Sequence, residues 1–341
     1  MPLNKRVAIV LGIAVFVLLL GQILSYYTPS ANFSISTEKD GDTVTYTAKS
    51  GMDLQYTELH LDNGPYNAPS EFIILKDDRY PTEADSNFIK VTGYFLEREF
   101  GKCPSISFRY ADADAIAAKM DSDIASGTFD CGIIVLTGTL PDVLYDGDTD
   151  SRTIRWIKAG GAMYWSGGCF GRTYSTADGI EFVDSHSAVI SDILGDGTAI
   201  RDGSESTYGD QRINPELTEL SGMYHAGTRY GVDPTKVSSD IMTLGYTDGQ
   251  YASMAMMKVE NGMLTVFGDY TGYQNIQYLV HVLLLRLTYS TEIVSDDTGY
   301  INHGRHSASF EDSPGITHAV ILHDLKWAKA WIFDRGEGRF V

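Results

Sequence analysis

The middle of the chain alternates short apolar runs with segments of helical periodicity. Continuous apolar runs between turn-forming residues are typical of strands buried on both faces of a parallel sheet. Apolar positions three or four residues apart, as at Phe88, Val91 and Phe95, are typical of helices. We predict strands at 72–75, 105–110, 131–136 and 162–166, and helices at 87–100, 112–120, 153–159 and 183–194. This alternation predicts βαβ crossovers and a parallel α/β sheet.

A polar stretch and a second group of strands follow. Residues 196–214 are polar and rich in glycine, so we predict a long loop, which is uncommon unless functional or mobile. Asn261-Gly262 lies between two apolar segments and predicts a hairpin turn. We predict strands at 241–244, 251–259 and 263–268, and a helix at 272–289.

Segments at both ends of the chain show the two-residue alternation of half-buried strands. Lys39-Asp40-Gly41-Asp42 predicts a hairpin turn between two N-terminal strands. We predict further strands at 55–61, 300–310 and 318–333. The N-terminal strands alone are too few to bury a sheet face. We therefore expect residues 28–66 and 291–341 to form one small discontinuous β domain, with an α/β domain at 67–290.

The first 27 residues predict a membrane anchor. Lys5 and Arg6 precede an apolar run at 7–24, and about 20 apolar residues span the bilayer core as a helix. Basic residues on the short leading side place that end in the cytoplasm. We expect residues 1–27 to be an uncleaved single-pass anchor in the cell membrane, with the bulk of the chain extracytoplasmic. A cleaved signal peptide is the alternative. Asn32 begins a glycosylation sequon, with an unmodified loop as the alternative.

The composition limits the classes of molecule that the protein can bind. The formal net charge is -19, which argues against nucleic acid because phosphate binding requires clustered Lys and Arg. The three cysteines form neither a disulfide framework nor a zinc-ligand pattern. The partner stays open between a protein and a carbohydrate. The many tyrosines and tryptophans could line a sugar site, and the alternative is that they pack in the core.

Candidate chemistry centres on Cys169. Gly167-Gly168-Cys169-Phe170-Gly171 has the form G-x-C-x-G and follows a predicted buried strand. Such a turn exposes a nucleophile at the end of a strand, and a following helix N-terminus lowers the pKa of the thiol. The alternative is a buried structural thiol.

Residues 71–290 resemble the class I glutamine amidotransferase-like superfamily, particularly its divergent ThuA-like or non-catalytic relatives. The resemblance rests on the strand at 133–136, the helix–Gly-Gly–strand step at 156–165 and the late hairpin at 254–268. It implies a flavodoxin-like architecture. It also implies Cys169 as the nucleophile of a triad that a His-x-Glu pair after a late strand would complete.

The sequence departs from that pattern in two places. Gly268-Asp269-Tyr270-Thr271 follows the late strand, and no His-x-Glu occurs anywhere in the chain. The residues after Cys169 are not convincingly helical. We therefore predict a degenerate, non-catalytic domain used for binding or as a surface component. The alternative is an extracytoplasmic cysteine hydrolase or transferase, for which His225 and His186 are the nearest plausible bases.

Two further predictions concern cysteine pairing and calcium. Cys131 opens one strand and Cys169 follows the end of the next, so these two cannot pair; if any pair is oxidised it is Cys103–Cys131. Asp146, Asp148 and Asp150 begin like a calcium loop, the one candidate metal site. The loop lacks the glycine and the acid of the sixth and twelfth positions. The alternative is that Asp150 or Ser151 caps the following helix.

Overall fold

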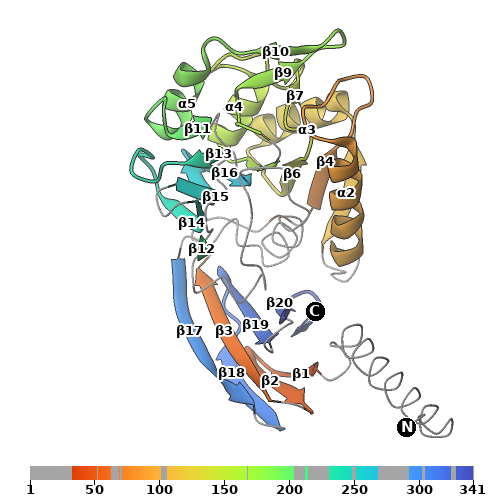
Figure 1. The fold of residues 1–341 in the computed structure, drawn as a ribbon. Helices are drawn as coiled ribbons and strands as arrows, with labels where there is room; N and C mark the ends of the chain where they lie inside the picture. Colours follow the sequence, from red (N-terminus) through yellow and green to blue (C-terminus); the bar gives the residue numbers. More distant parts are fainter. Residues whose placement is uncertain are drawn as a thin grey trace, which may run out of the picture.

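The computed structural model shows a mixed α/β part and a group of strands from both ends of the chain (Figure 1). It describes residues 33–51, 53–62, 69, 71–100, 106–166, 168–202, 212–213, 230–247, 251–267, 292–301, 304–323 and 328–340. Among these residues no helix is both long and apolar enough to cross a membrane. The apolar run at 7–24, Asn32 and the helix predicted at 272–289 lie outside the described residues.

Five parallel strands form the centre of the α/β part. They are β4 (Glu71–Leu75), β5 (Ser107–Ala111), β6 (Cys131–Val135), β8 (Ala162–Ser166) and β16 (Gly262–Phe267). Their spatial order is β5-β4-β6-β8-β16, so in order along the chain the strands lie 2-1-3-4-5. All five strands are parallel, and the direction in which successive strands are added to the sheet reverses between β4 and β6. The predicted parallel sheet is confirmed.

Antiparallel strands extend this sheet beyond β16. The predicted hairpin is formed by β15 (Tyr251–Val259) and β16, with Glu260 at φ 52° in its turn. The remaining strands are β14 (Ile241–Thr247), β13 (Tyr230–Val232), β12 (Arg212–Ile213) and β11 (Ile200–Asp202). The prediction of an unbroken loop at 196–214 was therefore wrong at β11 and β12. Both strands exist because partners distant in the sequence supply their hydrogen bonds.

Four helices accompany the sheet in the described part of the chain. They are α2 (Ser86–Phe100), α3 (Ala113–Ser126), α4 (Arg152–Ala159) and α5 (His186–Leu194). The Asp112 side chain accepts a hydrogen bond from Ala115 N at 2.9 Å and caps α3. Helix α3 runs six residues past its predicted end at 120, because the first residue that favours termination is Gly127, at φ 68°.

The Gly-Gly step holds α4 tightly against the sheet. Gly160 ends α4 at φ 143°, where a side chain would be strained. A Cβ on Gly161 would lie 2.2 Å from the Trp156 ring. Trp156 is fully buried, and its Nε1 donates a hydrogen bond to Asp123 Oδ2 at 3.0 Å. The two glycines therefore allow β8 to begin directly beneath the indole.

Strands from the two ends of the chain pair with one another, as expected, and form the β module. Its first sheet holds β1 (Phe33–Asp40), β2 (Thr43–Ser50) and β18 (Arg305–Glu311). Its second sheet has the order β17-β3-β19-β20-β21, with bounds β17 (Glu292–Ile301), β3 (Leu54–Asp62), β19 (Ile316–His323), β20 (Ala328–Asp334) and β21 (Arg339–Phe340). Buried side chains from both sheets, including Tyr46, Val320 and Trp331, share one core.

The two long strands predicted in the tail are wrong. The segment predicted at 300–310 spans the end of β17 and most of β18, with Gly304 between them. The segment predicted at 318–333 is a hairpin, in which Val320 of β19 lies opposite Trp331 of β20. Two short strands that pair with each other satisfy backbone groups that one long strand would leave unpaired.

Candidate functional site

The turn that carries Cys169 follows the carboxyl end of β8. Gly168 has φ 153°, and a Cβ there would lie 3.2 Å from the Gly138 carbonyl oxygen. Trp165 Nε1 donates to the Gly168 carbonyl at 2.8 Å, and the Tyr145 hydroxyl donates to the Gly171 carbonyl at 2.6 Å. Buried donors on both sides therefore hold the turn in one conformation.

His186, one of the two bases proposed from the sequence, lies beside Cys169. The Cys169 Sγ and His186 Nε2 atoms are 3.7 Å apart. The same Nε2 lies 3.1 Å from the Phe170 carbonyl oxygen. A carbonyl oxygen can only accept, so this hydrogen bond requires the proton on Nε2. In that tautomer Nε2 donates, and it has no lone pair with which to take the thiol proton.

The surroundings of Cys169 favour the neutral thiol. The residue is 2% exposed. Burial raises the pKa of its thiol to about 12, with Arg172 opposing and Glu83 adding to the increase. Burial also lowers the pKa of His186. The chain continues from the turn into the strand β9 (Thr173–Ser175), so Cys169 is not followed by the helix N-terminus that lowers a thiol pKa in a nucleophile turn.

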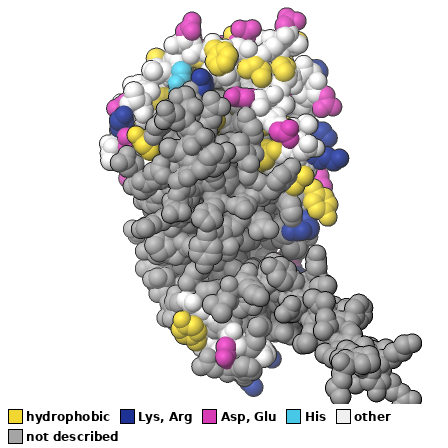
Figure 2. Space-filling model, in the orientation of Figure 1, with side chains coloured by type: hydrophobic (Ala, Val, Ile, Leu, Met, Phe, Trp, Pro, Cys, Tyr) yellow, Lys and Arg dark blue, Asp and Glu magenta, His cyan; other side chains and the backbone are white. Residues whose placement is uncertain are grey.

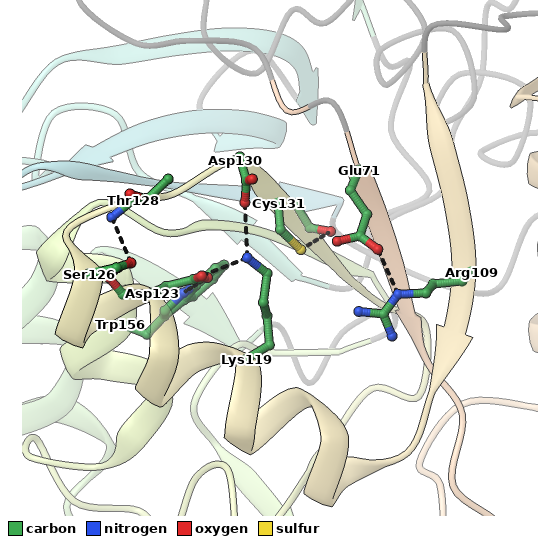
Figure 3. A network of polar contacts seen from close by, with 10 residues as sticks. Glu71, Arg109, Lys119, Asp123, Ser126, Thr128, Asp130, Cys131 and Trp156 are labelled. Atoms are coloured by element: carbon green, nitrogen blue, oxygen red, sulfur yellow. Dashed lines mark hydrogen bonds and ion pairs between the residues drawn. The ribbon is translucent and has the colours of Figure 1, made fainter.

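Cys131 lies at the opposite edge of the sheet, as predicted. It is the first residue of β6, and both Cys131 and Cys169 are free and buried. Figure 3 shows Cys131 near a network in which Lys119 Nζ contacts Asp123 Oδ1 at 2.6 Å and Asp130 Oδ1 at 2.9 Å. Burial raises the pKa of the Cys131 thiol to about 12. Cys103 and His225 lie outside the described residues.

The three aspartates of the predicted calcium loop bond mainly within their own loop. Asp146 Oδ1 accepts from Asp148 N at 3.3 Å, and Asp148 Oδ1 accepts from Asp150 N at 3.2 Å. Asp150 lies 3.7 Å from Arg155. No group of three or more His, Cys, Asp or Glu side chains in the described part of the chain is arranged to hold a metal ion. Ser151 is the N-cap residue of α4, although its hydroxyl makes no capping hydrogen bond.

Sequence reasoning missed a pocket at the carboxyl edge of the parallel sheet. It is a small, partly open depression with a cavity volume of about 10 Å³, close to the space that one water molecule needs. Its walls come from the loops after β4 and β6, from β7 (Leu140–Pro141) and from β9. The apolar part of the wall consists of Leu75, Tyr80, Pro81 and Pro141. The pocket lies where the strand order reverses, which is the usual ligand position in open α/β sheets.

Two buried hydroxyl groups belong to this wall and lack hydrogen-bond partners. Thr139 and Ser175 are each 1% exposed, and neither Thr139 Oγ1 nor Ser175 Oγ has a partner in the described structure. An unsatisfied buried hydroxyl costs about 1–3 kcal/mol. The parallel pairing of β7 with β9 places Pro141 opposite Ser175 and so brings the two segments together. No motif in the sequence predicts the pairing of β7 with β9.

The one acid of the pocket wall is occupied by structural contacts. Asp77 Oδ2 accepts from Ala113 N at 3.0 Å at the start of α3, and lies 2.6 Å from Arg79 Nη2. The Arg79 hydrogen bond is the main cause that lowers the pKa of Asp77 to about 2. No Lys or Arg belongs to the pocket wall. The pocket therefore provides neither a free carboxylate for a cation nor a cation for an anion.

The surface agrees with this lack of a cationic site. On the face drawn in Figure 2, basic side chains of the described residues lie among acidic ones and form no continuous patch.

No protein-family model matches the chain, and no curated protein matches it significantly. The class of the protein is therefore defined by its structure, as a mixed α/β fold with a five-stranded parallel sheet.

Proposed function

We propose that this protein is a membrane-anchored, extracytoplasmic binding component whose α/β domain is a degenerate, flavodoxin-like relative of the class I amidotransferase-like superfamily. The order 2-1-3-4-5 of the parallel strands is that of flavodoxin-like folds. The glycine-flanked turn after β8 stands where the superfamily carries its nucleophile. The anchor is the apolar run at 7–24.

The observation that carries the non-catalytic assignment is the hydrogen bond between His186 Nε2 and the Phe170 carbonyl. A catalytic cysteine needs a base with a free lone pair, or an environment that stabilises the thiolate. Cys169 has neither, because Nε2 is committed as a donor and burial raises the pKa of the thiol. Catalysis would require the imidazole to leave Phe170 and the thiol to become exposed.

The binding site that we propose is the pocket at the strand-order reversal. Thr139 Oγ1 and Ser175 Oγ are buried in the pocket wall without partners, so a ligand that displaced part of this wall would meet groups that both donate and accept hydrogen bonds. The apolar wall of the pocket and its lack of free charge favour an uncharged ligand. A polyol or a single sugar residue meets both conditions if it places one hydroxyl group in the depression, because a cavity volume of about 10 Å³ has room for little more. Of the two partners that the sequence left open, a protein and a carbohydrate, this chemistry favours the carbohydrate.

Binding can be tested by calorimetry on the full chain in detergent. We expect heat of binding with glycerol, mannitol or glucose, and loss of that heat in a Thr139→Val, Ser175→Ala double variant. Glucose 6-phosphate serves as the matched charged probe and should bind more weakly than glucose. Equal binding by the double variant, or no binding of any uncharged probe, would reject the pocket.

An extracytoplasmic cysteine hydrolase or transferase is the second candidate, and the 3.7 Å distance between Cys169 Sγ and His186 Nε2 is what favours it. A thiolate-selective probe distinguishes the two candidates. We expect Cys169 of the native full chain to react slowly at neutral pH. Rapid labelling that disappears in Cys169→Ser would establish the enzyme and overturn the non-catalytic assignment.

A further inference from the structure

Two histidines face each other inside the β module. His60 of β3 and His318 of β19 are direct partners in the antiparallel register, and their ring centroids lie 4.5 Å apart at 80°. His318 also stacks on Phe310 of β18, with centroids 3.7 Å apart. Because β18 belongs to the other sheet, the histidine pair lies at the contact between the two sheets.

The His318 ring makes no hydrogen bond to any described residue. The residue is 4% exposed, and neither Nδ1 nor Nε2 has a hydrogen-bond partner in the described residues. The Glu311 backbone lies close to the ring but outside hydrogen-bond geometry. Protonation would turn both nitrogens into donors in a site without acceptors, which is costly for a buried group. His318 is therefore neutral in the folded protein.

The acids nearest to the pair already have partners. Asp312 lies 2.7 Å from Lys39 Nζ and also pairs with Arg335. Glu58, on the same face of β3 as His60, lies 2.7 Å from His306 Nε2 and accepts from the Tyr46 hydroxyl. Neither carboxylate is available as a dedicated counter-ion for a new charge on the pair.

The charges around the pair set the direction of its titration. Burial lowers the pKa of His318 to about 3; His60 and Arg335 lower it further, and Asp312 opposes. Burial also lowers the pKa of His60, with Glu58 opposing. Protonating both rings would place two positive charges side by side, near Arg335.

We propose that the His60–His318 pair is a pH-sensitive latch. Both rings belong to the second sheet, and while neutral they pack against Phe310 of the first sheet. Their protonation in acid weakens this contact and separates the two sheets. The direction of this pH dependence follows from the linkage between proton binding and folding. Both histidines bind protons more readily in the unfolded chain, so their contribution to stability is complete above about pH 6.5 and declines as the pH falls toward 3. The β module would thus open in acidified surroundings, independently of what the pocket at the strand-order reversal binds.

The latch can be tested by unfolding the full chain with urea in detergent at a series of pH values from 7.5 to 4.5. Hydrogen exchange of peptides from β3 and β19 reports the unfolding of the β module, after correction for the pH dependence of the intrinsic exchange rate. We expect the unfolding constant of these peptides to rise about tenfold per pH unit below pH 6 for one histidine, and more steeply for two. His318→Gln and His60→Gln should each flatten this dependence.

Phe310→Leu is the matched control, because it removes the aromatic stack without removing a titrating group. It should weaken the module at every pH and leave the slope unchanged. A slope in His318→Gln equal to that of the unaltered chain would overturn the latch. Histidine NMR of the unaltered chain is a test that needs no variant, since a His318 ring that titrates near pH 6.5 in the folded protein would also overturn it.

Discussion

The Cys169 thiol and the His186 imidazole lie 3.7 Å apart, yet the proton on Nε2 points to the Phe170 carbonyl. The pair has the spacing of a loose catalytic dyad and the wrong tautomer for one. A single backbone oxygen, the Phe170 carbonyl, therefore determines which hydrogen bond Nε2 makes.

Alkylation of Cys169 should show the pH dependence of a buried thiol. Because its folded pKa is about 12, we expect the native rate to stay low through pH 9 and to rise only in stronger alkali, as followed by mass spectrometry. His186→Gln should not slow the reaction further. The raised pKa also stabilises the fold below about pH 9, and this contribution is lost as the pH rises toward 12. A native rate that levels off near pH 7 would contradict this prediction.

Removing the unsatisfied hydroxyls should stabilise the empty pocket. Thr139→Val and Ser175→Ala each delete a buried group without a partner, so we expect a gain of about 1 kcal/mol in the free energy of unfolding. Thr82→Val is the matched control, because the Thr82 hydroxyl lines the same pocket and donates to the Ala84 carbonyl at 3.1 Å. Urea titration without ligand should show a gain for the first two and none for the control.

Gly161→Ala should destabilise the α/β domain strongly. The new Cβ would lie 2.2 Å from the Trp156 ring, which is fully buried and cannot move aside. We expect a loss of about 3 kcal/mol by thermal or urea unfolding. Gly179→Ala, where a Cβ meets nothing within 4 Å, should be close to neutral. Similar losses at both positions would show that the Gly-Gly packing is not what matters.

Asp123 should matter far more than Asp130, although both bind Lys119 (Figure 3). Asp123 is 2% exposed and accepts from Trp156 Nε1, so Asp123→Ala leaves a buried indole donor unsatisfied. We expect a loss of about 3 kcal/mol. The Asp130 side chain is 58% exposed, and Asp130→Ala should cost less than about 1 kcal/mol. Urea titration of the two variants side by side gives the comparison.

The proposed anchor has a direct test. The full chain should remain in the membrane pellet after alkaline carbonate extraction, and deletion of residues 1–27 should release it. The intact mass of the mature protein separates an anchor from a cleaved signal peptide. Release of the full-length, uncleaved chain by carbonate would contradict the anchor.

Local pattern was sufficient for the elements whose environment is uniform along their length. The strands predicted at 72–75 and 162–166 are apolar at every position except Ser166, because both faces of the parallel sheet are covered, and the structure has strands there. The pairing of the two ends of the chain also followed from the sequence, since a few half-apolar strands cannot bury a face alone.

Tertiary structure alone decided the contacts between distant segments. The tautomer of His186 depends on the Phe170 carbonyl, the pocket depends on the pairing of β7 with β9, and the environment of His318 depends on which strand lies opposite it. The local sequence around either partner does not predict any of these contacts. Periodicity reports how much of an element is buried, whereas only the folded chain determines which groups meet and whether their hydrogen bonds are satisfied.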